Sequence, residues 1–195
     1  MKYCKVFGVL FVSLLVFISC SDDDKPDVPV GDTADRIGVV SKADFDKYVV
    51  GKYWKISERA FFDSDGMATD ERLSGTFGGT VAQYFSDGNI YSDYFDAGPV
   101  AEKPIQGQYY YIKDNPFSYD EKTGDVIVQT TGSVGNYFLF YVEYADEGKL
   151  VALSNFGWMA GSGETPNKSY VRATYVPMTD AEVAELESKF VAWPK

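Results

Sequence analysis

The chain has 195 residues, of which 45% are hydrophobic and 16% aromatic, and its formal net charge is −11 at pH 7. This length and apolar content suit one domain with a single core, while the negative charge opposes binding to nucleic acid or to bare anionic lipid. The chain has no histidine, which excludes Ser-His-Asp and Cys-His catalytic centres and histidine-ligated zinc or haem. We therefore expect no cofactor, no metal and no nucleic-acid partner, while carboxylate chemistry stays open.

The first residues have the layout of a cleavable export signal. Two lysines precede an apolar run from Val6 to Ile18, and a serine then precedes Cys20. The run has 13 residues, which is too short to span a bilayer comfortably. We predict that residues 1–19 are a signal peptide, with an uncleaved apolar anchor as the alternative. The only other cysteine, Cys4, lies in that segment, so the mature chain would form no internal disulfide.

The end of this segment, Phe17-Ile18-Ser19-Cys20, resembles the bacterial lipoprotein signal, with phenylalanine at position 17 where leucine is usual. The resemblance implies cleavage before Cys20 and acyl chains on that cysteine. The following run, Ser21-Asp22-Asp23-Asp24, resembles the surface-export signal of Bacteroidetes-type lipoproteins. It implies a protein anchored by lipid in the outer membrane and displayed on the cell surface. The alternative is that the acidic run is only a solvated spacer.

Residues 20–40 are rich in aspartate, with two prolines and two glycines, and show no hydrophobic periodicity. We predict that they form a lipidated flexible tether and that the folded domain covers residues 41–195. Within the tether, Asp32-Thr33-Ala34 resembles the three-residue O-glycosylation signal of exported proteins from the same bacterial group. The resemblance implies a glycan on Thr33, and the alternative is a chance match.

The domain begins with a predicted helix and strand. Ser41 is placed as an N-cap with an acid three residues later, and Gly51 would end the helix. Residues 52–62 then favour a strand, followed by a turn at residues 63–66. The Asp-x-Asp-Gly of that turn could also suggest calcium, but a calcium loop would need an acid where Arg72 stands. We expect a solvated turn.

Residues 80–86 and 89–95 predict a hairpin joined by Asp87-Gly88, the dipeptide that a type I′ turn prefers. This turn would pair residue 85 with 90 and residue 83 with 92, which sets Gln83 opposite Ser92. The predicted inner face carries Phe85, Ile90, Gln83, Ser92, Val81 and Tyr94, and the outer face carries Tyr84, Tyr91, Ala82 and Asp93. A polar rung on the inner face favours a cavity over a dry core.

Five more strands and a second helix follow. Residues 106–113 and 125–131 favour strands, with residues 116–119 as a short arm between them. A second hairpin, residues 136–145 and 149–156, would place these residues on one core face: Phe138, Phe140, Val142, Tyr144, Leu150, Ala152, Ser154 and Phe156. After it we expect a long loop that carries Trp158 and acts as a lid, a last strand at residues 168–176, and a helix opened by the capping box at Thr179.

These elements predict an all-β (mainly β) fold: an antiparallel up-and-down eight-stranded barrel with a short N-terminal helix and a C-terminal helix. The runs Gly51-Lys52-Tyr53-Trp54 and Phe85-Ser86-Asp87-Gly88, with Arg172 in the last strand, resemble the lipocalin-like domains of Bacteroidetes-type lipoproteins over residues 45–178. The resemblance implies that Trp54 packs beneath Arg172. The alternative is that Trp54 is an ordinary core residue.

Function follows from this fold by analogy. The leading hypothesis is a surface-anchored protein whose barrel binds a small apolar or glycan-like ligand through Gln83, Ser92, Tyr94, Phe140, Ser154 and Trp158. The alternative is a solid barrel that acts as a non-enzymatic accessory component, docking an outer-membrane protein through exposed tyrosines such as Tyr84 and Tyr91. A hydrolase would need paired carboxylates, for which Asp93 and Glu143 are the candidates. Nothing in the sequence brings those two together, so we expect no enzyme and no catalytic residue.

Overall fold

The computed structural model describes residues 33–63, 65–69, 80–96, 109–129, 136–155 and 170–192. Its elements, in chain order, are α1 (Lys42–Asp44), η1 (Phe45–Val49), β1 (Tyr53–Phe62), β2 (Ala68–Thr69), β3 (Thr80–Phe85), β4 (Ile90–Asp96), β5 (Tyr109–Asp120), β6 (Asp125–Val128), β7 (Tyr137–Ala145), β8 (Leu150–Asn155), β9 (Tyr170–Pro177), α2 (Asp180–Lys189) and β10 (Val191–Ala192).

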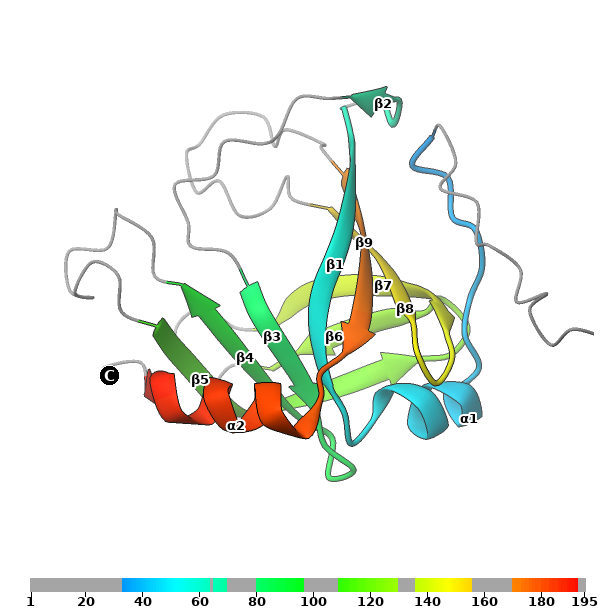
Figure 1. The fold of residues 1–195 in the computed structure, drawn as a ribbon. Helices are drawn as coiled ribbons and strands as arrows, with labels where there is room; N and C mark the ends of the chain where they lie inside the picture. Colours follow the sequence, from blue (N-terminus) through cyan, green and yellow to red (C-terminus); the bar gives the residue numbers. More distant parts are fainter. Residues whose placement is uncertain are drawn as a thin grey trace, which may run out of the picture.

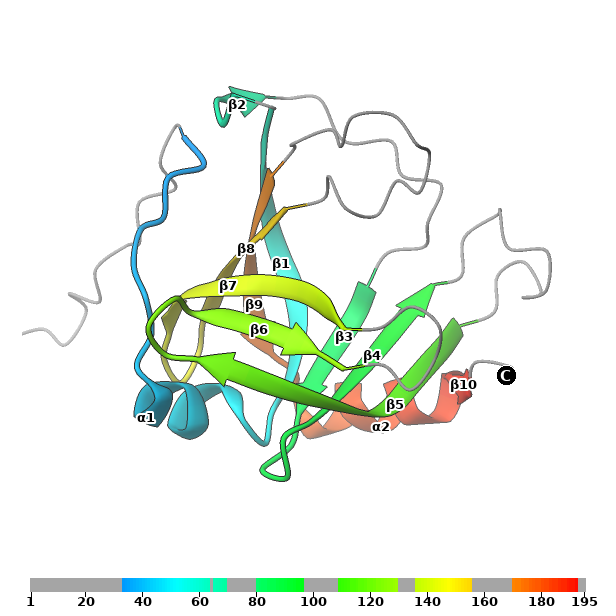
Figure 2. The same ribbon diagram turned by 180° about the vertical axis from the view of Figure 1, so that it is seen from behind.

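Eight strands form a closed antiparallel barrel in sequential order (Figures 1 and 2). In the series β1, β3, β4, β5, β6, β7, β8, β9, each strand pairs with the one that follows it. The last strand, β9, pairs with β1 and closes the ring. This confirms the predicted fold class and is consistent with a lipocalin-like fold. Two short strands are added to it: β2 pairs with β1, and β10 pairs in parallel with the first half of β5.

The barrel has two different ends. At one end, hairpin turns at residues 86–89, 121–124 and 146–149 join the strands, and we call this the short-turn end. At the other end, the strands are joined by the connections 63–79, 97–108, 129–136 and 156–169, and we call this the long-loop end.

The helix before β1 closes the short-turn end (Figure 1). Ser41 caps it as predicted, because its side chain accepts a hydrogen bond from the backbone N–H of Asp44. Phe45 is fully buried and lies among aromatic rings of the barrel interior, with ring centroids 4.1 Å from Tyr119 and 6.0 Å from Phe85. Trp54 is also fully buried, and its indole N–H donates to the carbonyl of Val49 (2.9 Å). The interior is therefore filled with side chains at this end.

The second helix, α2, lies on the outer face of the sheet across β3, β4 and β5 (Figure 1). The predicted capping box at Thr179 is present, with Glu182 as its reciprocal partner. Leu186 and Phe190 form a buried cluster with Ala82 and Tyr94 of the sheet. This second core lies outside the barrel, so buried residues on β3 and β4 belong to either of two faces.

The hairpin of β3 and β4 differs from its predicted register by one residue. Phe85 pairs with Tyr91 and Gln83 pairs with Asp93, where the prediction set Gln83 against Ser92. The loop contains three residues, with Asn89 in the left-handed conformation (φ 56°), and a three-residue loop of this kind replaces the two-residue type I′ turn. A shift of one residue turns every side chain of one strand to the other face.

Strand β5 is longer than predicted, because residues 116–119 continue it and do not form a separate arm. A register shift between Tyr91 and Asp93 of β4 marks a bulge in β5, where Asp114 has a φ of 66°. Pro116 is accommodated just after the bulge, and its carbonyl accepts from the Gln129 N–H (2.7 Å).

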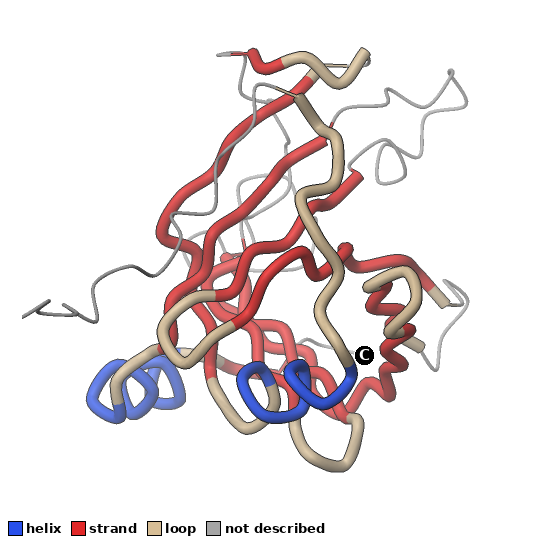
Figure 3. Tube along the Cα trace, turned by 90° about the vertical axis from the view of Figure 1, so that its right-hand side faces the viewer, coloured by secondary structure: helices blue, strands red, loops and turns tan. Residues whose placement is uncertain are grey.

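Residues 33–40 run along the outside of the barrel down to α1 (Figure 3). We call this segment the N-terminal strap. It lies so close to β7 that a Cβ added at Gly38 would be 2.8 Å from the carbonyl oxygen of Glu143. The side chain of Arg172 donates to the carbonyls of Thr33 (3.2 Å) and Asp35 (2.6 Å). Residues 33–40, predicted as part of the flexible tether, therefore belong to the folded domain.

Candidate functional site

A polar cluster lies on the inner face of the barrel, beyond the aromatic residues that fill the short-turn end. Gln83 and Asp93 are opposite each other on β3 and β4, and cross-strand partners share a face. The Gln83 side chain is only 4% exposed, and its Nε2 donates to the hydroxyl of Tyr91 (3.0 Å). The side chains of Tyr91 and Thr80 also lie close enough to the Asp93 carboxyl group to lower its pKa.

Two acceptor oxygens of this cluster are unsatisfied. Within the described part of the chain, Gln83 Oε1 and Asp93 Oδ1 are excluded from solvent and have no hydrogen-bond partner. We call these two atoms the acceptor pair. A buried polar group without a partner costs about 1–3 kcal/mol, so the fold bears this cost in a place where a ligand donor could remove it.

The electrostatics of the cluster are dominated by burial. Burial raises the pKa of Asp93 from 3.8 to about 7, and the hydrogen bonds from Thr80 and Tyr91 oppose this rise only in part. Burial also raises the pKa of the hydroxyls of Tyr137 and Tyr175, and the nearby Asp93 charge adds to both rises. The site therefore contains one carboxyl group that titrates near neutrality and tyrosines that stay neutral.

The inner face near Asp93 is open enough to expose an apolar side chain. Ile112 of β5 is the cross-strand partner of Asp93, so it shares the inner face, yet it is 38% exposed. Arg59, also exposed, pairs with Ala173 of the core and acts electrostatically on the Tyr175 hydroxyl. The inner wall thus changes from packed aromatics at the short-turn end to a mixed polar and apolar lining.

The predicted ligand-binding residues divide between the two faces. Gln83, Phe140 and Ser154 lie on the inner face; Phe140 belongs to the core cluster, and Ser154 follows Leu150 and Ala152 in the alternation of β8. Ser92 and Tyr94 lie on the outer face, which corrects their placement in the cavity. Trp158, predicted in the lid, lies outside the described residues.

Sequence reasoning missed Asp93 and Tyr91 as site residues because it placed them on the outer face. The signal that could have found them is Asn89, which follows Gly88 and readily takes the left-handed conformation. A loop ending at Asn89 predicts the observed register. In the second hairpin, Phe140, Val142, Leu150 and Ala152 are in the core as predicted, whereas the ring of Phe138 lies tilted against that of Tyr141, with centroids 4.5 Å apart.

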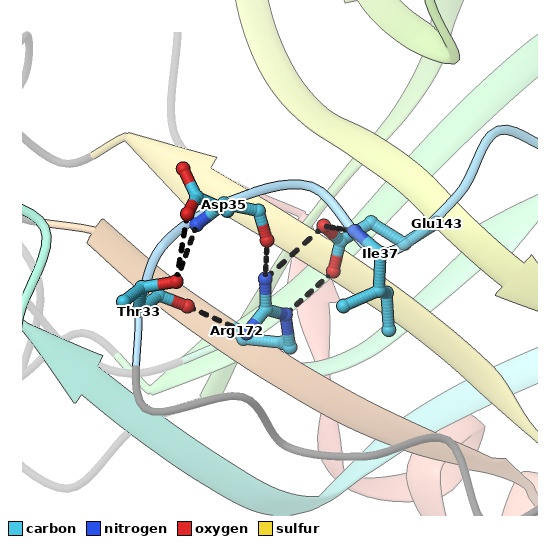
Figure 4. Close-up of polar contacts among 5 residues, drawn as sticks. All are labelled: Thr33, Asp35, Ile37, Glu143 and Arg172. Atoms are coloured by element: carbon cyan, nitrogen blue, oxygen red, sulfur yellow. Dashed lines mark hydrogen bonds and ion pairs between the residues drawn. The ribbon is translucent and has the colours of Figure 1, made fainter.

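A buried ion pair lies on the other side of the barrel wall (Figure 4). Arg172 Nε is 2.6 Å from Glu143 Oε2, and the two side chains are 2% and 0% exposed. Glu143 follows the inward-facing Val142, so the alternation of β7 places it on the outer face beneath the N-terminal strap, where it also accepts from the Ile37 N–H (3.2 Å). Glu143 therefore does not meet Asp93, and these two acids form no hydrolytic pair.

The same ion pair corrects the expected contact between Trp54 and Arg172. Arg172 pairs with Ala60 and lies over the ring of Phe62, with its guanidinium carbon 5.2 Å from the ring centroid. Trp54 pairs instead with Gln83 and Pro177, nearer the short-turn end. Trp54 is thus a core residue, the alternative that the sequence left open.

The outer tyrosines are engaged with α2. The hydroxyls of Tyr94 and Tyr53 donate to Glu187 Oε1 at 2.5 and 2.9 Å, and Lys113 pairs with the same carboxylate at 3.0 Å. Tyr84 stacks on Tyr53 (centroids 4.4 Å apart). Tyr91, expected as an exposed docking residue, is buried inside the barrel. The contacts with Glu187 hold α2 against the sheet. Of the two tyrosines predicted to dock a partner, only Tyr84 lies on the outer face.

Two further observations concern the described residues only. None of their helices is long and apolar enough to cross a membrane. They also bring together no group of three or more acidic or cysteine side chains that could hold a metal ion. Thr33 is partly exposed and bonds to Asp35 Oδ2 (3.0 Å), and its glycosylation stays a prediction, as does the lipidation of Cys20, which lies outside the described residues.

Comparisons with protein-family models, with curated proteins and with solved structures found no match to this chain.

Proposed function

We propose that this protein is a lipid-anchored outer-membrane protein, displayed on the cell surface, whose barrel binds a small ligand with an apolar or sugar-like body. The observation that carries the binding proposal is the acceptor pair, Gln83 Oε1 and Asp93 Oδ1, buried on an inner wall that also exposes Ile112. Ligand sites typically combine an apolar lining with a few polar groups that fix orientation. The aromatic interior supplies the lining, and the acceptor pair supplies the polar groups.

The competing function, docking of another outer-membrane component by a solid barrel, has less support. Its two named tyrosines do not form one patch, because Tyr91 is inside and Tyr84 is stacked on Tyr53. The packed short-turn end alone would fit a solid barrel. The unsatisfied acceptors favour a ligand, because the large majority of buried polar atoms in native proteins have a hydrogen-bond partner, and here two such atoms without one lie on the same inner face.

Replacing Gln83 with leucine is expected to weaken ligand binding about tenfold or more without loss of stability. Leucine removes an unsatisfied buried oxygen, which offsets the loss of the hydrogen bond to Tyr91. Binding can be followed with the fluorophore N-phenylnaphthylamine, which joins an apolar body to one N–H donor, and stability by thermal unfolding.

The matched control is Ser92→Ala, which changes a buried polar residue on the outer face of the same hairpin. It should leave fluorophore binding unchanged. Equal binding by wild type and Gln83→Leu, with a lower melting temperature for the variant, would mean that Gln83 is only structural and would contradict the proposal.

The anchor has its own test. Cys20→Ala should abolish incorporation of a fatty-acid analogue in growing cells and move the protein out of the membrane fraction, because two or more acyl chains hold a protein far more durably than one. Cys4→Ala is the matched control and should be labelled like wild type. Labelling of Cys20→Ala at the wild-type level would refute lipidation at this residue.

A further inference from the structure

Among the described residues, the carboxyl group of Asp93 has no cationic partner. In the described segments, the salt bridges involve other acids: Asp46, Glu143, Glu182, Glu185 and Glu187. Among the basic side chains of the described residues, Arg59 lies on the inner face, but it is exposed, and its charge lowers the pKa of the Tyr175 hydroxyl. A buried carboxylate is normally paired, so the missing partner of Asp93 is a positive charge.

The surroundings of Asp93 suit a small cation. The hydroxyl of Tyr91, which accepts from Gln83, belongs to the same inner face, and the hydroxyl groups of Tyr137 and Tyr175 are close enough for the Asp93 charge to raise their pKa. The net charge of −11 adds a long-range field that draws cations toward the protein.

We propose that Gln83 and Asp93 bind the ammonium group of a small amine, whose carbon body lies along the apolar inner wall beside Ile112. An ammonium carries three N–H donors and no acceptor, which complements two acceptor oxygens that lack donors. A neutral hydroxyl could donate to one of them but would leave the Asp93 charge unpaired. This inference rests on the proposed function, since it names the chemical class of the ligand for the same cavity.

A purely internal arrangement is the alternative. Gln83 and Asp93 are opposite each other, so a protonated Asp93 could donate its own hydrogen to Gln83 Oε1 and satisfy both groups without a ligand. In that arrangement an amine would gain nothing over the corresponding alcohol. The two cases therefore differ in a measurable preference.

The test compares phenethylamine with phenethyl alcohol, which share one carbon body and differ in the polar group. Binding is measured by calorimetry and by the NMR shift of the Asp93 carboxyl carbon, at about pH 6 and about pH 8. We expect the amine to bind roughly tenfold to a hundredfold more tightly than the alcohol at the higher pH.

The preference should shrink at the lower pH, where Asp93 is protonated. The other groups that face it do not change charge in this interval: Thr80 and Gln83 are neutral, Arg59 is cationic, and burial raises the hydroxyl pKa values of Tyr91, Tyr137 and Tyr175 above their usual range. Asp93→Asn should abolish the preference. Asp87→Asn, which removes the same charge from an exposed turn, should keep it.

The outcomes separate the two proposals. Equal affinity of an amine and its alcohol, or a preference that survives in Asp93→Asn, overturns the amine inference while the ligand-binding function stands. No effect of any probe or of N-phenylnaphthylamine on the Asp93 carboxyl signal overturns both.

Discussion

Replacing Arg172 with methionine is expected to lower the free energy of unfolding by about 3–5 kcal/mol. The Glu143 side chain is completely buried, and Arg172 contacts both of its oxygens, at 2.6 and 3.3 Å. Without the guanidinium, a buried carboxylate keeps its desolvation cost and loses its partner, and two strap carbonyls lose their donor. Urea denaturation at neutral pH measures the change.

The double variant Arg172→Met/Glu143→Leu should be more stable than Arg172→Met, because it leaves no unpaired buried charge. The matched surface control is Lys55→Met, which breaks the ion pair with Glu182 on partly exposed side chains and should cost less than about 1 kcal/mol. Hydrogen exchange at the Ile37 amide should rise in Arg172→Met, since its acceptor is Glu143. A loss no greater than that of Lys55→Met would show that the buried pair contributes little.

The second large effect is a pH dependence of stability set by Asp93. Its folded-state pKa, about 7, lies above the unfolded value of 3.8, so the folded protein binds more protons between these values. Stability should therefore be greatest below about pH 4 for this group and should fall as pH rises through 7, by at most about 4 kcal/mol. Asp93 is partly exposed, and screening by water reduces this loss of stability.

Asp93→Asn keeps the shape of the side chain and removes the titration. Its unfolding free energy should stay nearly level from about pH 5 to about pH 8, where that of the wild type declines, and it should exceed the wild-type value at the upper end. The lowered pKa of Glu182, about 2, acts only in stronger acid and does not interfere. Parallel pH profiles for the two proteins would mean that Asp93 is ionised throughout this interval.

Much of the fold could be predicted from the sequence because its signals are local. Alternating apolar residues marked most of the strands, and the capping box at Thr179 marked the start of α2. The barrel order followed from short connections between successive strands. Register depended on one loop residue, Asn89, and a slip of one position exchanged Ser92 and Tyr94 for Tyr91 and Asp93 on the inner wall.

The remaining features depend on contacts between distant parts of the chain. The partnership of Glu143 and Arg172 joins β7 to β9, which are separated by β8 in the sheet, and neither strand alone indicates it. Pro116 suggested an interruption in β5, but the bulge at Asp114 lets the strand continue past it. The N-terminal strap is held in place by hydrogen bonds from its backbone to Arg172 and Glu143. Such bonds need no pattern of apolar side chains, so hydrophobic periodicity could not reveal the strap.

The two residues of β10 have a consequence for how copies of this protein meet. Strand β6 pairs only with residues 117–120 of β5, and β10 pairs with Tyr110 and Tyr111, which lie beyond that stretch. A strand edge with free N–H and C=O groups can add a strand from another molecule and start intermolecular aggregation. By occupying this edge with Val191 and Ala192, the protein shields β5 from such edge-to-edge assembly.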